Sequence, residues 1–114
     1  MNWIPLTSED QLQEIITESE KGPVMIFKHS TRCSISSTSM NRLERNWNES
    51  EMSNVKAFYL DLLSYRPISA KIESLFHVEH QSPQALVIER GKSIWDASHY
   101  DIQYDAIKKI VTSF

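Results

Sequence analysis

Apolar residues recur along this chain in two different spacing patterns, and the order of these patterns predicts alternating strands and helices. The run Val24 to Phe27 is apolar without alternation, which is typical of a strand covered on both faces. Leu12, Ile15 and Ile16 instead return at the spacing of one helix face. By these criteria we expect strands at Trp3 to Leu6, Val24 to Phe27, Val55 to Leu62, Ala85 to Ile88 and Ser93 to Trp95. Helices are expected from Thr7 or Ser8 to Gly22, from Cys33 to Trp47, from Arg66 to Phe76 and from Asp101 to Phe114.

The signals at the ends of these segments support the same order. Ser8 and Gln11 have the spacing of a capping box, and Gly22 before a proline is a typical helix stop. Residues 90–92 predict a tight turn, so the strand after it is an antiparallel hairpin partner. The order β-α-β-α-β-α-β-β-α predicts an α/β protein with a mixed central sheet between two helical layers. No change of composition marks a second unit, so residues 1–114 are expected to form one domain.

Composition and charge exclude several classes of function. The 114 residues include 12 basic and 15 acidic side chains, and the longest basic run is Lys108-Lys109. A nucleic-acid backbone needs a basic stripe, so nucleic acid is not an expected partner. No segment reaches the roughly 20 apolar residues that cross a bilayer, and the first residues lack the pattern of a signal peptide. One cysteine provides no disulfide framework, and a reducing cytoplasm is the expected location.

The single cysteine, Cys33, follows a strand and begins a helix, which is where chemistry gathers in sheets of this kind. Free N–H groups and the helix dipole at such a position favour a thiolate. We expect Arg32 and Lys28 to add positive charge nearby. Ser36, one helical turn further on, either turns its hydroxyl toward the sulfur or is an ordinary first-turn residue. The opposing interpretation is a buried, inert cysteine, but Cys33 follows polar residues rather than an apolar run.

Two features resemble a known family. The order of elements, a cysteine at the tip of the second helix, and Ser82-Pro83 just before the strand Ala85 to Ile88 together look like the thioredoxin fold. The segment Thr31-Arg32-Cys33-Ser34-Ile35-Ser36 is similar to the Thr-Arg-Cys-Pro-Ile-Ser motif of the monothiol bacilliredoxins, bacillithiol-linked proteins of Firmicutes. Ser34 stands where this motif has proline, a difference that softens the helix start but leaves the nucleophile in place. Ser36 stands at the position of a dithiol enzyme's second cysteine, so Cys33 has no internal partner.

The resemblance implies a specific exchange reaction for Cys33. A bacilliredoxin thiolate attacks the mixed disulfide between a client protein and bacillithiol, a thiol built from cysteine, glucosamine and malate. It takes bacillithiol onto its own sulfur, and a further thiol then regenerates it. Bacillithiol is therefore an expected co-substrate, with no bound cofactor, and the expected partners are bacillithiolated client proteins and a low-molecular-weight thiol.

The resemblance also assigns expectations to the residues around the cysteine. Thr31, Arg32, Ser34 and Ser36 are expected to stabilise the thiolate or contact substrate. For Arg32 the choice is between the malate carboxylates and a solvated loop position. Ser82-Pro83 is expected to be a cis peptide facing Cys33, which would leave the Ser82 backbone free to pair with an extended substrate.

The main alternative is a non-catalytic binding module of the same fold with an incidental cysteine. A cysteine hydrolase would need a histidine beside Cys33 and a third residue orienting it, and no feature of the sequence supports that arrangement. His29, at a strand end, is interpreted as a packed or exposed bystander. His77 and His80 have the spacing of metal ligands but lack a nearby cysteine or carboxylate partner, so no metal site is expected.

Overall fold

Strands and helices alternate along the chain in the order predicted from the sequence. The computed structural model describes residues 1–112, so the end of the last predicted helix at Phe114 lies outside the described residues. The elements are β1 (Trp3–Pro5), α1 (Asp10–Ser19), β2 (Val24–His29), α2 (Ser34–Asn46), β3 (Lys56–Asp61), α3 (Arg66–Phe76), β4 (Gln84–Glu89), β5 (Lys92–Ser98), the 3-10 turn η1 (His99–Asp101) and α4 (Tyr104–Val111).

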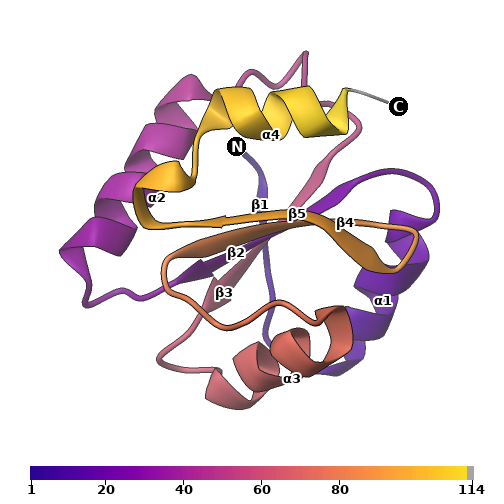
Figure 1. The fold of residues 1–114 in the computed structure, drawn as a ribbon, viewed down its shortest axis with the longest axis vertical. Coiled ribbons are helices and arrows are strands. Elements are labelled where there is room, and N and C mark those ends of the chain that lie inside the picture. Colours follow the sequence, from indigo (N-terminus) through magenta and orange to yellow (C-terminus); the bar gives the residue numbers. More distant parts are fainter. Residues whose placement is uncertain (113–114) are drawn as a thin grey trace.

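The strands form one mixed sheet with the order β1-β3-β2-β4-β5. Strand β3 runs parallel to both β1 and β2, whereas β4 is antiparallel to β2 and to β5. Helices α1 and α3 cover one face of this sheet, and α2 and α4 cover the other (Figure 1). The prediction of a mixed sheet between two helical layers is therefore confirmed.

Both faces of the sheet are buried, which explains the unbroken apolar run in β2. Val24 and Ile26 pack toward α1 and α3, whereas Met25 and Phe27 pack toward α2 and α4. All four side chains are at most 1% exposed. Because side chains of a strand alternate between the faces, a strand covered on both sides loses the polar half of its pattern.

The hairpin between β4 and β5 closes through a two-residue turn. Glu89 pairs with Lys92, and the two residues between them, Arg90 and Gly91, have φ values of 52° and 74°. Positive φ at both central residues is the geometry that matches the twist of the flanking strands. The end of α1 supports the turn, because the carbonyl and hydroxyl oxygens of Ser19 accept the Arg90 and Gly91 N–H groups at 2.9 and 2.8 Å.

Two predicted helix starts are wrong by a few residues. Helix α1 begins at Asp10, although half of the predicted capping box forms: the Gln11 side-chain oxygen accepts the Ser8 N–H at 3.0 Å. Asp101 does not cap the last helix but ends η1, and α4 begins at Tyr104. The completely buried Ile102 separates them in an extended conformation, so burial of this side chain interrupts the helical path.

Candidate active site

The ends of three strands meet at the edge of the sheet that carries the cysteine. The pairing of β2 with β4 and of β4 with β5 places Gln84 beside both Lys28 and Ser98. The loop before α2, the Ser82-Pro83 loop before β4 and the turn η1 after β5 therefore all lie at this edge (Figure 1).

Cys33 lies at the start of α2, as predicted, where it occupies the N-cap position and is partly exposed. Its backbone is extended, with φ −105° and ψ 120°, and its N–H donates to the Ser30 carbonyl at 3.1 Å. Its own carbonyl accepts the N–H of Ser37, which starts the helical hydrogen-bond ladder. The three amides between Cys33 and Ser37 precede that ladder, so they are free to stabilise a negative charge at the helix tip.

The Ser36 hydroxyl is directed at His29 rather than at the sulfur. Its Oγ lies 2.6 Å from His29 Nδ1 and accepts the Ser30 N–H at 3.0 Å. Ser36 is completely buried and His29 is only 7% exposed. Burial lowers the pKa of His29 from its ordinary 6.5, and the carboxylates of Asp61 and Glu44 partly oppose this shift. The interpretation of His29 as a bystander missed this pair.

Lys28 does not contribute charge beside Cys33, so that prediction is wrong. It alternates with His29 along β2 and therefore points to the face covered by α1 and α3, away from α2. It is completely buried, and its Nζ lies 3.2 Å from His80 Nδ1. Burial lowers the pKa of Lys28 to about 8, with Glu73 acting in the opposite direction.

His80 connects Lys28 to the loop that precedes β4. Its Nδ1 also lies 3.3 Å from the Ser69 hydroxyl, and its backbone N–H donates to the Glu73 carboxylate at 2.6 Å. Burial is the main cause that lowers the pKa of His80, and the positive charge of Lys28 is the second. Because Lys28 and Ser69 are both able to donate toward Nδ1, this nitrogen is best occupied as an acceptor, which leaves the imidazole neutral.

The Ser82-Pro83 peptide bond is cis, as the resemblance implied. The buried Gln84 supports the preceding loop, because its side chain donates to the Glu79 carbonyl at 2.9 Å and accepts the Gln81 N–H at 3.3 Å. The Pro83 carbonyl accepts the His99 N–H at 3.1 Å, which ties this loop to η1. The Ser82 backbone makes no hydrogen bond within residues 1–112.

The remaining predicted site residues surround Cys33 on the surface. Thr31, Arg32 and Ser34 are exposed and form no side-chain hydrogen bond or ion pair in the part of the chain that the structure describes. Ile35 directly follows them and is 38% exposed. The surface around the sulfur is therefore polar and basic with one apolar side chain, and its groups are unoccupied by internal contacts.

The described residues provide no geometry for the metal site or the cysteine hydrolase considered above. No three His, Cys, Asp or Glu side chains of residues 1–112 lie close enough together to hold a metal ion. His29 bonds to Ser36, and no histidine in the described part of the chain bonds to Cys33, as a hydrolase would require. His77 ends α3 as an exposed residue with φ 57°. No helix within residues 1–112 is long and apolar enough to cross a membrane.

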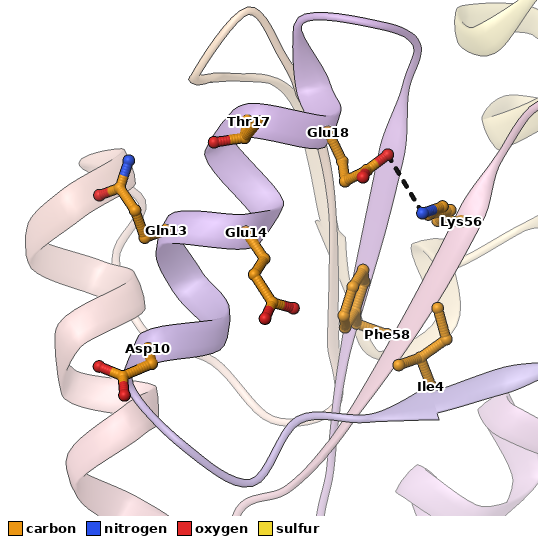
Figure 2. A pocket seen from close by; sticks show the side chains of 8 residues that line it. All are labelled: Ile4, Asp10, Gln13, Glu14, Thr17, Glu18, Lys56 and Phe58. Carbon is orange, nitrogen blue, oxygen red and sulfur yellow. Dashed lines mark ion pairs between the residues drawn. The ribbon is translucent and has the colours of Figure 1, made fainter.

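One hollow of the described surface lies away from the cysteine, between α1 and the strands β1 and β3 (Figure 2). It has a volume of about 450 Å³, and Ile4 and Phe58 line its apolar side. Glu18 there forms an ion pair with Lys56 at 3.1 Å. None of its lining residues is a cysteine or histidine, so it does not compete with Cys33 as a reactive site.

Solved structures share this fold over nearly their whole length. A provisionally assigned oxidoreductase with a thioredoxin fold superposes with a TM-score of 0.80 at 29% identity, covering 94% of this chain and 91% of that one. Thioredoxin from Fasciola hepatica superposes with a TM-score of 0.72 at 16% identity and 95% coverage of both chains. Thioredoxin from Trypanosoma brucei brucei gives 0.73 at 17% identity, covering 95% of this chain and 86% of that one.

This fold, with a cysteine at the tip of α2 and serine one turn later, defines a thioredoxin-fold redox protein that works with one thiol. The family model described as monothiol bacilliredoxin BrxC matches residues 4–107, and the chain belongs to that family. The family resemblance of the Thr31 to Ser36 segment is thereby confirmed.

Proposed function

We propose that Cys33 removes bacillithiol from protein mixed disulfides by a one-thiol route. The observation that carries the proposal is the partly exposed cysteine at the N-cap of α2, with the buried Ser36 at the position where a dithiol enzyme has its second cysteine. Membership of the monothiol bacilliredoxin family supports bacillithiol as the group transferred.

The proposed reaction consists of two thiol-disulfide exchanges. In the first, the Cys33 thiolate attacks the bacillithiol sulfur of the client's mixed disulfide. A new disulfide forms between Cys33 and bacillithiol, the old one breaks, and the client cysteine leaves as a thiolate and takes up a proton. In the second, a low-molecular-weight thiolate attacks the bacillithiol sulfur of this adduct and expels the Cys33 thiolate. The electrons balance because each step exchanges one disulfide for another.

The amides at the helix tip serve both steps. They stabilise the Cys33 thiolate as it attacks, and they stabilise it again when it leaves, because a better-stabilised thiolate is a better leaving group. A protein with one cysteine needs the second effect, since no neighbouring thiol is present to expel the adduct.

The exposed groups around Cys33 supply the proposed contacts to substrate. Arg32 is the one cation among them and suits the malate carboxylates of bacillithiol, while Thr31 and Ser34 offer hydroxyls to its sugar. The unpaired backbone of Ser82 offers a donor and an acceptor to an extended client segment. The clients and the thiol are proposed to meet this protein in a reducing cytoplasm.

The test follows bacillithiol from a labelled client onto this chain by intact mass spectrometry. Wild type is expected to gain one bacillithiol mass while the client loses one. Cys33→Ser should show neither change, because no other residue carries the adduct. Thr38→Ala, an exposed change on α2, is the matched control and should behave like wild type.

Two results would contradict the proposal. One is a wild type that strips the client no faster than Cys33→Ser. The other is a Cys33 that reacts with iodoacetamide no faster than a cysteine in a denatured chain. Either result would favour a binding module whose cysteine is incidental.

A further inference from the structure

The pair formed by His29 and Ser36 lies at the base of the loop that carries Cys33, and the reaction proposed above does not use it. The Ser36 Oγ lies 2.6 Å from His29 Nδ1 and 3.0 Å from the Ser30 nitrogen. The carbonyl of Ser30 in turn accepts the Cys33 N–H. One buried hydroxyl therefore links an imidazole to the segment that positions the sulfur.

The protons of this network have two consistent arrangements. A serine hydroxyl has one proton to donate and two lone pairs to accept with, and the Ser30 N–H uses one lone pair throughout. When Nδ1 of His29 is unprotonated, the Ser36 hydroxyl donates its proton to that nitrogen. When Nδ1 is protonated, it donates to the second lone pair of Ser36, and the hydroxyl proton needs another acceptor.

The Cys33 sulfur is the acceptor that the helix provides. Cys33 is the N-cap residue of α2 and Ser36 is the third residue of the helix, the two positions whose side chains turn back toward each other's backbone in a capping box. Cys33 is partly exposed, whereas Ser36 is completely buried. Ser36 thus bonds His29, and Cys33 caps the helical turn that holds Ser36.

We infer that His29 is a positioning residue for the Cys33 reaction and acts through Ser36, holding the hydroxyl proton while the imidazole is neutral and releasing it toward the sulfur once the imidazole is protonated. This inference rests on the thiol exchange proposed above. It gives the buried imidazole a part in both exchange steps.

The proton transfer balances in both directions. As Cys33 loses its proton, the S–H bond breaks and a bond forms from that proton to the Ser36 oxygen, while the Ser36 proton moves to Nδ1 of His29. The products are a thiolate that accepts a hydrogen bond from Ser36 and an imidazolium that donates one to Ser36. The reverse transfer returns the proton to the sulfur, and no oxidant or reductant takes part.

The surroundings of His29 suit a group that is neutral at rest and is able to accept a proton. Burial disfavours the imidazolium and lowers the pKa of His29, while Asp61 on β3 and Glu44 on α2 favour the imidazolium. Tyr59 on β3 also faces the imidazole, with the ring centres 5.7 Å apart. A thiolate on Cys33 would add a third negative charge that favours protonated His29.

The test compares the rate of iodoacetamide alkylation against pH in four chains: wild type, His29→Gln, Ser36→Ala and the double variant. Glutamine is able to accept the Ser36 hydrogen bond but does not titrate. Wild type is expected to show two inflections, one from His29 and one from Cys33. His29→Gln should lose the lower inflection, and below the midpoint of the remaining one its rate should be about tenfold lower than that of wild type, because no imidazolium is left to accompany the thiolate.

The Ser36→Ala chain separates a relay from a simple charge effect. If the imidazole acts through Ser36, this variant loses the lower inflection although His29 is still present, and the double variant matches it. A wild-type profile in His29→Gln, or two inflections retained in Ser36→Ala, would overturn the inference. If the pH profiles contradict the inference while bacillithiol still transfers to Cys33, the proposed function stands without a role for His29.

A second experiment leaves His29 and Ser36 unchanged, so its result does not depend on whether the variants at these two positions fold. By linkage, a group that alters the titration of Cys33 must itself respond to Cys33. The imidazole signals of His29, followed by NMR, should show a second step in wild type at the pH where Cys33 titrates. Cys33→Ala should remove that step, and an identical His29 curve in both chains would refute the coupling.

Discussion

Replacing Lys28 with methionine tests what a completely buried ammonium group does to the stability of this fold. The Lys28 side chain is enclosed between β2 and the α1–α3 layer, with the His80 imidazole at 3.2 Å as its hydrogen-bond partner. Burial lowers its pKa from an ordinary 10.5 to about 8. Methionine has a similar length and no charge, so it retains the packing and removes the ammonium group.

The sign of the effect follows from proton binding. Between pH 8 and 10.5 the unfolded chain holds a proton on Lys28 that the folded chain has released, so stability rises with pH across this window. Below about pH 8 the whole penalty is present, and at about 1.4 kcal/mol per pH unit it amounts to about 3 kcal/mol. The variant also loses the hydrogen bond between Lys28 and His80, which reduces its gain in stability by about 1 kcal/mol. Lys28→Met should therefore be about 2 kcal/mol more stable than wild type at pH 7.

The assay is urea unfolding of both chains at intervals from pH 7 to 10.5. The advantage of Lys28→Met should shrink as pH rises through the window and vanish or reverse near pH 10.5. Lys71→Met, an exposed change on α3, is the control and should give a small difference from wild type at every pH. A Lys28→Met chain that is less stable than wild type at pH 7, or a difference that does not vary with pH, would refute the reasoning.

Three further predictions concern the core, the loop before β4 and the hairpin. Leu43 lies on α2 with its side chain 1% exposed, so Leu43→Ala should lower the free energy of unfolding by about 2–5 kcal/mol in urea titrations. A loss below 1 kcal/mol would contradict its placement in the core. Gln84→Met removes the two side-chain hydrogen bonds to the loop before β4. Bacillithiol transfer from a protein client should then slow, while iodoacetamide should still alkylate Cys33 at the wild-type rate. Equal slowing of both reactions would count against a role of this loop in client docking. Gly91→Ala should lower the stability by about 1–2 kcal/mol because φ is +74° at this position. The added Cβ meets only ordinary contacts, so the backbone conformation is the source of the loss. Thermal unfolding should show a smaller loss for Gly22→Ala, where φ is not positive.

The parts of the fold that the sequence predicts well are those with several signals in agreement. Strand β2 combines an unbroken apolar run with a preceding proline, and the start of α2 combines a polar loop with a helical period after it. The cis bond at Ser82-Pro83 was expected from the family resemblance alone, because an isolated X–Pro pair favours trans. Local pattern and family likeness thus contributed different features.

The errors occur where tertiary contacts decide between local options. Asp101 has the chemistry of a helix cap, but burial of Ile102 delays the helix to Tyr104. Lys28 is close to Cys33 in the sequence, but side chains alternate along β2, so Lys28 lies on the opposite face of the sheet, beside His80. The pairing of His29 with Ser36 joins a strand end to a helix start across seven residues, and only the folded loop brings them together.

The buried hydroxyl of Ser36 also bears on how a one-thiol protein of this kind diverges from dithiol relatives. A cysteine at this position would place a larger, weakly hydrogen-bonding sulfur where one oxygen now bonds both His29 and Ser30. Acquiring a resolving thiol by a single substitution would therefore loosen the loop that presents Cys33 in the same step. Under the proposed route, the lifetime of an adduct on Cys33 would depend both on the thiol supply of the cell and on how well the tip of α2 stabilises the departing thiolate.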